Sequence, residues 1–177
     1  MGCRKQFKSS FEPSTKKFIK SEIDGWTQLE NKAAIKVFAL WFIVNAVIAF
    51  LYYAKILGQW DMVLLSLFYF VCDMICLLVW CPFQYFIMKN RCCVTCRIFN
   101  WDSIMVCTPL IFIRGFFSWS LVAVAFFLLI RWEYSYWKHP LRFFEGSNEN
   151  LQCKHCKEKI CKTKRLLDLR NMHSRSI

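Results

Sequence analysis

Glycine, proline and acidic residues are all scarce in this chain. Its 177 residues include five Gly, four Pro and twelve Asp and Glu, against 24 Lys and Arg. So little Gly and Pro excludes a fibrous or low-complexity protein, and a hydrophobic content of 56% excludes an intrinsically disordered one. At this length we expect a single domain.

Charge of either sign is nearly absent from the middle of the chain. Residues 37–130 hold five basic and three acidic residues, whereas residues 1–36 hold eight and four, and residues 131–177 hold eleven and five. Long apolar runs of this kind are typical of membrane-spanning segments. We interpret the basic ends as membrane-edge segments that meet anionic lipid on the cytoplasmic side, and not as a surface for nucleic acid.

The apolar runs predict an all-α fold, a small polytopic helical membrane protein. Two full spans are expected at about 33–57 and 62–88, followed by a third apolar segment at 103–130. This third segment is too long for one comfortable span and too short for two. It is either a broken, re-entrant hairpin that turns at mid-depth near Arg114-Gly115 or one long, tilted helix. The basic tail resists translocation, which favours the hairpin and places both termini in the cytoplasm.

The two ends flank this transmembrane region of residues 33–130. Residues 1–32 form a basic N-terminal segment, with apolar residues from Ile19 onward at near-helical spacing. This spacing predicts a helix in the membrane interface, with a helix packed on the rest of the protein as the alternative. Residues 131–177 form an aromatic and basic membrane-edge segment and a cysteine-containing tail. We expect no cleavable signal peptide, because the first apolar run follows a long charged region.

Cysteine is abundant, with eleven residues, and six of them gather in two polar clusters. A C-x2-C pair occurs in each cluster, and two such pairs can present four thiolates to a tetrahedral zinc ion. The pairs are 56 residues apart, so a shared site requires both clusters at one membrane face. We therefore expect zinc as the cofactor; an iron–sulfur cluster, a redox dithiol, disulfides or unligated thiols could use the same residues. The candidate metal ligands are Cys93, Cys96, Cys153, Cys156 and Cys161.

Three polar residues fall within the apolar segments. Asp73 lies in the second segment, Arg114 in the third and Asn45 in the first. Charged groups at that depth cost several kcal/mol unless they face the protein interior and pair. The sequence predicts an ion pair between Asp73 and Arg114 with Asn45 as a neighbour, which would form either an ion, proton or substrate pathway or a contact that fixes helix packing.

Signatures of classical catalysis are missing from the sequence. It has no G-x-S-x-G, no glycine-rich phosphate loop and no H-E-x-x-H, and its three histidines all follow residue 138. The sequence therefore favours a non-enzymatic membrane adaptor or assembly subunit, whose partners would be the bilayer and either another protein or a second copy of the chain. A membrane thiol–disulfide oxidoreductase is one alternative. An oligomeric small transporter or channel that uses Asp73 and Arg114 is the other.

Overall fold

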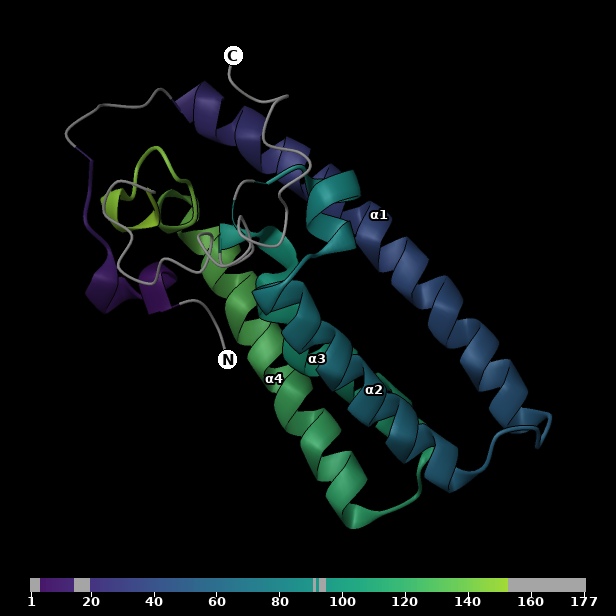
Figure 1. The fold of residues 1–177 in the computed structure, drawn as a ribbon. Helices are drawn as coiled ribbons and strands as arrows, with labels where there is room; N and C mark the ends of the chain where they lie inside the picture. Colours follow the sequence, from purple (N-terminus) through teal and green to yellow (C-terminus); the bar gives the residue numbers. More distant parts are fainter. Residues whose placement is uncertain (1–3, 15–19, 91, 93–94, 153–177) are drawn as a thin grey trace.

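Four α-helices make up most of the described chain (Figure 1). The computed structural model describes residues 4–14, 20–90, 92 and 95–152. The described residues are mainly helical, which confirms the predicted all-α class, and three of the helices are long and apolar enough to cross a membrane. They are α1 (Lys20–Tyr53), α2 (Gln59–Leu78) and α4 (Phe116–Lys138), and the fourth is the short α3 (Asp102–Cys107).

Short helical turns connect and flank these helices. The π-helix η3 (Phe83–Met88) and the 3-10 turn η5 (Arg97–Trp101) lie between α2 and α3. A 3-10 turn, η6 (Thr108–Phe112), continues α3. The remaining 3-10 turns are η1 (Arg4–Gln6), η2 (Lys8–Ser10), η7 (Pro140–Arg142) and η8 (Glu149–Leu151).

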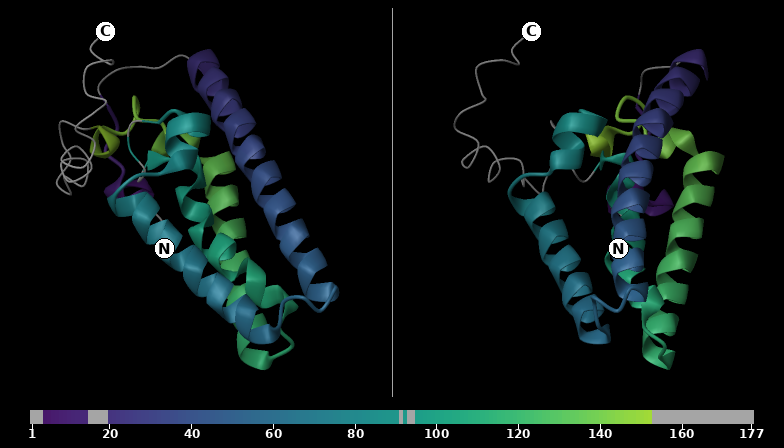
Figure 2. Two further views of the ribbon diagram at one scale, coloured as in Figure 1. Left: turned by 45° about the vertical axis from the view of Figure 1, so that its right-hand side comes forward. Right: turned by 90° about the vertical axis from the view of Figure 1, so that its right-hand side faces the viewer.

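Successive helices run in opposite directions and give the molecule two different ends (Figures 1 and 2). At one end, called the turn end here, lie the connections 54–58 and 113–115. At the other end the described parts of 4–14, 81–101 and 139–152 form a cap over the helices. The ring of Phe112 lies 5.9 Å from that of Tyr52 and 6.2 Å from that of Tyr53, so η6 reaches the turn end.

Local chemistry explains where the second helix begins and ends. The backbone N–H of Gly58 donates a hydrogen bond of 2.7 Å to the carboxylate of Asp61, in the first turn of α2. The helix ends at Leu78, ten residues before the predicted end of the second span at Met88. The chain is irregular over residues 79–81 and becomes helical again at Pro82, directly before η3. A proline disfavours a helical conformation at the residue before it, which separates η3 from α2.

The third apolar segment is a hairpin with unequal arms. Its first arm is α3 and η6, with Pro109 inside η6, and its second arm is the 23-residue α4. Six residues at ~1.5 Å and five at ~2.0 Å give the first arm a length of ~19 Å. The contacts of Phe112 with the end of α1 place the turn near Arg114 at the turn end of the bundle, and not at mid-depth.

Exposed aromatic side chains mark both ends of two helices. Trp60 is 82% exposed at the start of α2, and Trp80 is 47% exposed just beyond its end. On α4, Phe116 and Trp137 are 83% and 80% exposed. Helix rise separates each pair by roughly 30 Å, which matches the thickness of a bilayer's hydrocarbon core. Aromatic belts at this spacing are typical of a membrane protein.

The buried apolar core lies at the cap end. Ala34 and Val37 of α1 pack with Met88, Cys96 and Ile98. The part of α1 that precedes residue 33 continues toward the cap, where Trp26 packs on the rings of Tyr136 and Phe144 at centroid distances of 6.2 and 5.2 Å. Residues 20–32 are therefore the first turns of α1, and the predicted helix in the membrane interface stays a prediction.

Candidate functional site

Two segments that are far apart in sequence are hydrogen-bonded together in the cap. The side chain of Asn148 has no exposed surface, and its amide donates to the carbonyls of Lys5 and Arg142 at 3.1 and 2.9 Å. The backbone N–H of Glu149 donates to the carbonyl of Glu12 at 2.9 Å. These bonds hold the N-terminal segment against the segment that follows α4.

A buried arginine joins the cap to α4. The guanidinium of Arg97 donates two hydrogen bonds to the carboxylate of Glu133, at 2.7 and 2.5 Å, and its carbon lies 3.8 Å from the ring centroid of Tyr136. The indole N–H of Trp101 donates to the same carboxylate at 2.7 Å. A bidentate pair of this kind fixes both distance and orientation. The η5 turn is thus fixed to the end of α4.

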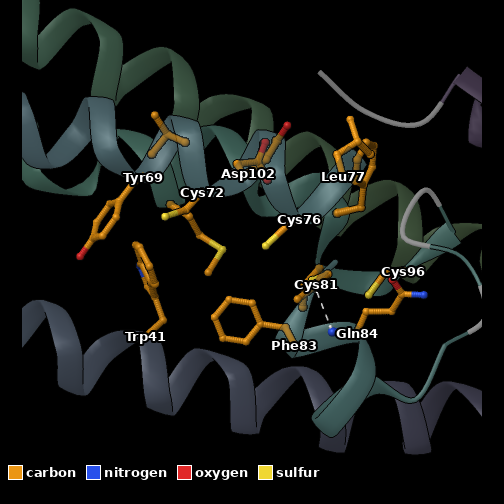
Figure 3. Close-up of a pocket in the computed structure, with 15 residues that line it drawn as sticks. Trp41, Tyr69, Cys72, Cys76, Leu77, Cys81, Phe83, Gln84, Cys96 and Asp102 are labelled. Carbon is orange, nitrogen blue, oxygen red and sulfur yellow. Dashed lines mark hydrogen bonds between the residues drawn. The ribbon is translucent and has the colours of Figure 1, made fainter. Parts of the chain in front are cut away.

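A cavity of about 120 Å³ lies beneath the cap, between α1 and α2 (Figure 3). Its walls come from α1, α2, α3 and the connection between α2 and α3, and they are mainly apolar. Four thiols line it, from Cys72, Cys76, Cys81 and Cys96. The other lining residues are Trp41, Tyr69, Asp73, Leu77, Phe83, Gln84, Ile98, Phe99, Asp102, Met105 and Val106.

Cys96 is the one predicted metal ligand among the described residues. It is 3% exposed and lines the cavity, and Figure 3 shows it beside Cys81, near Gln84. It lies in the connection outside the membrane-spanning helices, where burial raises the pKa of its thiol to about 12. A thiol in that setting is protonated near neutral pH, so in the metal-free protein it is a poor nucleophile.

The other four predicted metal ligands fall outside the described residues. Cys93 belongs to the loop before η5, and Cys153, Cys156 and Cys161 belong to the tail. Across residues 4–14, 20–90, 92 and 95–152, no group of three or more His, Cys, Asp or Glu side chains could hold a metal ion. The predicted zinc site stays a prediction.

The structure separates the predicted intramembrane pair. Asp73 lines the cavity, 13 residues along α2 from Trp60 and so ~20 Å from the turn end. Arg114 is exposed in the connection at the turn end itself. Within the described residues the two form no ion pair. Asn45 is 7% exposed and its amide donates to the carbonyl of Trp41 on its own helix at 2.9 Å, while its side-chain oxygen accepts no hydrogen bond.

Sequence reasoning missed the ion pair that the described structure does contain. Arg97 and Glu133 are 36 positions apart, and no pattern in the sequence connects them. The available signal was a single acidic residue between two aromatic residues, Trp132 and Tyr134, in a mainly basic segment. That signal identifies Glu133 as unusual but does not identify its partner.

No protein-family model, curated protein or solved structure matches this chain. Similarity therefore assigns no role to any residue. The features on which a function can be proposed are three apolar helices, a hydrogen-bonded cap at one end and a mainly apolar cavity beneath it that four thiols line.

Proposed function

We propose that this protein is an integral membrane adaptor or assembly subunit, whose helices hold the cap at the cytoplasmic face. Three apolar helices and the aromatic residues at both ends of α2 and α4 support the membrane placement. The chain ends that form and extend the cap carry most of its Lys and Arg, and basic segments stay in the cytoplasm. The basic surface would meet anionic lipid or an acidic partner protein.

One observation carries the proposal: the N-terminal segment and the segment after α4 are hydrogen-bonded to each other at the cap end. Asn148 makes these bonds to Lys5 and Arg142, and Leu151, near the beginning of the tail, is buried there. The tail that follows Gln152 then starts at the same end as the loop before η5. This arrangement favours two cytoplasmic termini over a third segment that crosses as one tilted helix.

Because the tail starts at the same end of the molecule as the loop before η5, a zinc site between them is also supported, with a different set of ligands from the one that the sequence predicts. We propose that Cys93 binds zinc together with the tail thiols Cys153, Cys156 and Cys161, which supplies the four thiolates of a structural site. Cys96 is left out because its side chain is 3% exposed and lines the cavity. Lysines beside the tail cysteines would offset the negative charge of four thiolates.

The two alternative functions have weaker support. A thiol–disulfide oxidoreductase needs an attacking thiol of lowered pKa, whereas burial raises the pKa of Cys96. A transporter built around Asp73 and Arg114 needs the two charges together, and helix rise places Asp73 ~20 Å from the turn end, where Arg114 lies. An adaptor requires neither an attacking thiol nor a pair of charges within the membrane.

The sidedness of the tail tests the topology. In one variant Cys156 is kept as the sole cysteine of the two polar clusters, and it is treated with a membrane-impermeant maleimide in intact and in opened cells. Cys92, which is half-buried, serves as the reference in a second variant, because the buried Cys96 would react poorly. We expect labelling of Cys156 only after opening, with denatured samples giving full labelling. Labelling in intact cells would overturn both the cytoplasmic tail and the shared zinc site.

Metal analysis of the purified protein tests the zinc site separately. We expect one zinc per chain in the wild type, loss of zinc in Cys93→Ser and Cys156→Ser, and retained zinc in the matched variant Cys96→Ser. A wild-type protein purified without chelator that contains no zinc would refute the site and leave the adaptor topology standing.

A further inference from the structure

The cavity beneath the cap is walled on its inner side by helices. Cys72 and Cys76 of α2 line one wall, and Met105 and Val106 of α3 line the back. Toward the cap it is covered by the connection between α2 and α3, where Ile98 is 8% exposed. Water from the cap side therefore meets a packed layer before it meets the cavity.

An aromatic pair closes the cavity toward the turn end. The rings of Trp41 on α1 and Tyr69 on α2 lie 4.7 Å apart, and Figure 3 shows both at one end of the cavity. Among the described residues, none from α4 lines the cavity. In the same described part of the chain, α1 contributes Trp41 alone to the lining, so the side toward α1 is the least covered. Phe42 follows Trp41 and Ile75 precedes Cys76 in the sequence, and both are exposed apolar residues, as expected of helices in contact with hydrocarbon.

We propose that this cavity binds the acyl chain of a membrane lipid, which enters sideways between α1 and α2. Polar groups line it at Tyr69, Asp73, Gln84 and Asp102, and most of the surface that it presents comes from rings, aliphatic groups and thiols. Such a surface offers few partners to water, which needs two to four polar groups to be held in a cavity. A void without contents loses the dispersion energy of its lining atoms. The bilayer supplies chains at that depth, and about 120 Å³ approaches the size of engineered cavities that take up benzene.

The depth of the cavity identifies the part of the chain that would enter. Cys76 and Cys72 precede Trp80 by four and eight residues, which places them ~6 and ~12 Å below the aromatic belt at the cap end. Carbon atoms at that depth belong to the upper part of an acyl chain, near the ester groups. The occupant is therefore a lipid whose headgroup stays at the level of the cap.

Photocrosslinking of the full-length protein tests the inference. The protein is placed in phosphatidylcholine vesicles in which some lipid carries a diazirine on an upper acyl carbon, and the modified residues are mapped by mass spectrometry. We expect label on Met105 and Val106, on the back wall, in addition to label on outward residues such as Ile75. Label confined to outward residues in the wild type would overturn the proposal, whatever the variants do.

A matched pair of neighbouring substitutions separates the cavity from the outer surface. Cys72→Phe fills the cavity, whereas Val71→Phe adds the same ring to a residue that is 47% exposed on α2. We expect Cys72→Phe to lower label on Met105 about tenfold, because the ring takes the space of the chain, and Val71→Phe to leave it unchanged. Equal labelling of Met105 in folded Cys72→Phe and in wild type would also overturn the proposal. If gel filtration shows that Cys72→Phe does not fold, the wild-type map decides alone.

Discussion

The cap and the helical bundle are held together in different ways. In the cap, Asn148 has no exposed surface, Leu151 and Phe143 are 4% and 5% exposed, and hydrogen bonds join segments more than 100 positions apart. Along the helices, in contrast, few side chains are buried: the candidate spans α2 and α4 have 6% of their most apolar stretch buried. Met62 and Ala125 are among the exceptions.

The solvent of each region explains this difference. Water drives apolar side chains of the cap into a core and makes every unpaired polar group there costly. Lipid tails solvate Leu or Phe as well as a neighbouring helix does, so the bundle gains little from burying them. The bundle is therefore held by local contacts, such as the ring pair of Trp41 and Tyr69, and by the connections at its ends.

The largest expected effect concerns the reactivity of Cys96 in the cap. With its pKa raised from 9.0 to about 12, we expect it to react with N-ethylmaleimide near pH 8 about 1,000-fold more slowly in the folded protein than in the denatured one, because only the thiolate attacks. Site-resolved mass spectrometry of the wild type over a time course measures both rates. A folded rate within tenfold of the denatured rate would show that the cap does not bury this thiol.

Removal of the buried arginine should cost the cap more than any bundle contact. Arg97→Met leaves Glu133 without its partner, and we expect the free energy of unfolding to fall by about 2–3 kcal/mol. This loss is smaller than for a fully buried pair, because the Glu133 side chain is 38% exposed and water solvates it in part. Unfolding in mixed micelles with increasing SDS measures it. The control is Arg131→Met, which changes an exposed basic residue on α4, the helix of Glu133, and it should change the free energy of unfolding little. Equal losses in both variants would contradict the pairing.

Loss of the asparagine that joins the two chain ends should have the next largest effect. Asn148→Ala removes three hydrogen bonds from a side chain without exposed surface, and we expect a loss of about 2 kcal/mol together with release of the N-terminal segment. Faster trypsin cleavage after Lys5 and Lys8 reports that release. Gln28→Ala, at an exposed position of α1, should leave cleavage unchanged. Cleavage at the wild-type rate in Asn148→Ala would mean that other bonds hold the segment.

The smallest effect is expected for a hydrogen bond inside the bundle. The hydroxyl of Ser66 on α2 donates to the carbonyl of Val106 on α3 at 2.8 Å. We expect Ser66→Ala to cost about 0.6 kcal/mol, a typical value for such bonds in lipid, as measured in the same micelles. Ser120→Ala, whose hydroxyl bonds within its own helix, should cost less. If Ser66→Ala lowers the free energy of unfolding as much as Asn148→Ala does, the proposed difference between the cap and the bundle is wrong.

Much of the helical content was predictable because it depends on local sequence. An apolar run of 20 residues or more forms a helix in lipid whatever its neighbours, since every backbone polar group must be paired within the segment. The second span was predicted to reach Met88, with Pro82 as a point where it kinks or ends, and α2 ends ten residues earlier at Leu78. The apolar run continues past that end, so hydropathy does not mark it. The start of α1 at Lys20 was left open, because its contacts with Tyr136 and Phe144 come from distant segments.

The candidate sites were less predictable. The cysteine spacing indicated a shared zinc site, yet the burial of Cys96 depends on η3, η5 and α1 meeting around it. Depth inferred from position within an apolar run placed Arg114 beside Asp73. The first arm of the third segment instead carries its turn to the level of Tyr52, because it begins at Asp102 and extends through the longer rise of a 3-10 turn.

The sequence by itself determined the solvent of this protein, its helices and the charge at its two ends. These properties depend on composition and on patterns within about twenty residues, and no long-range contact can reverse them. Only the tertiary structure decided that Arg97 pairs with Glu133, that Asn148 joins the two ends and that Cys96 turns toward an apolar cavity. Each of these depends on which distant segments meet in the cap, where packing in water selects one arrangement from many that the sequence pattern allows.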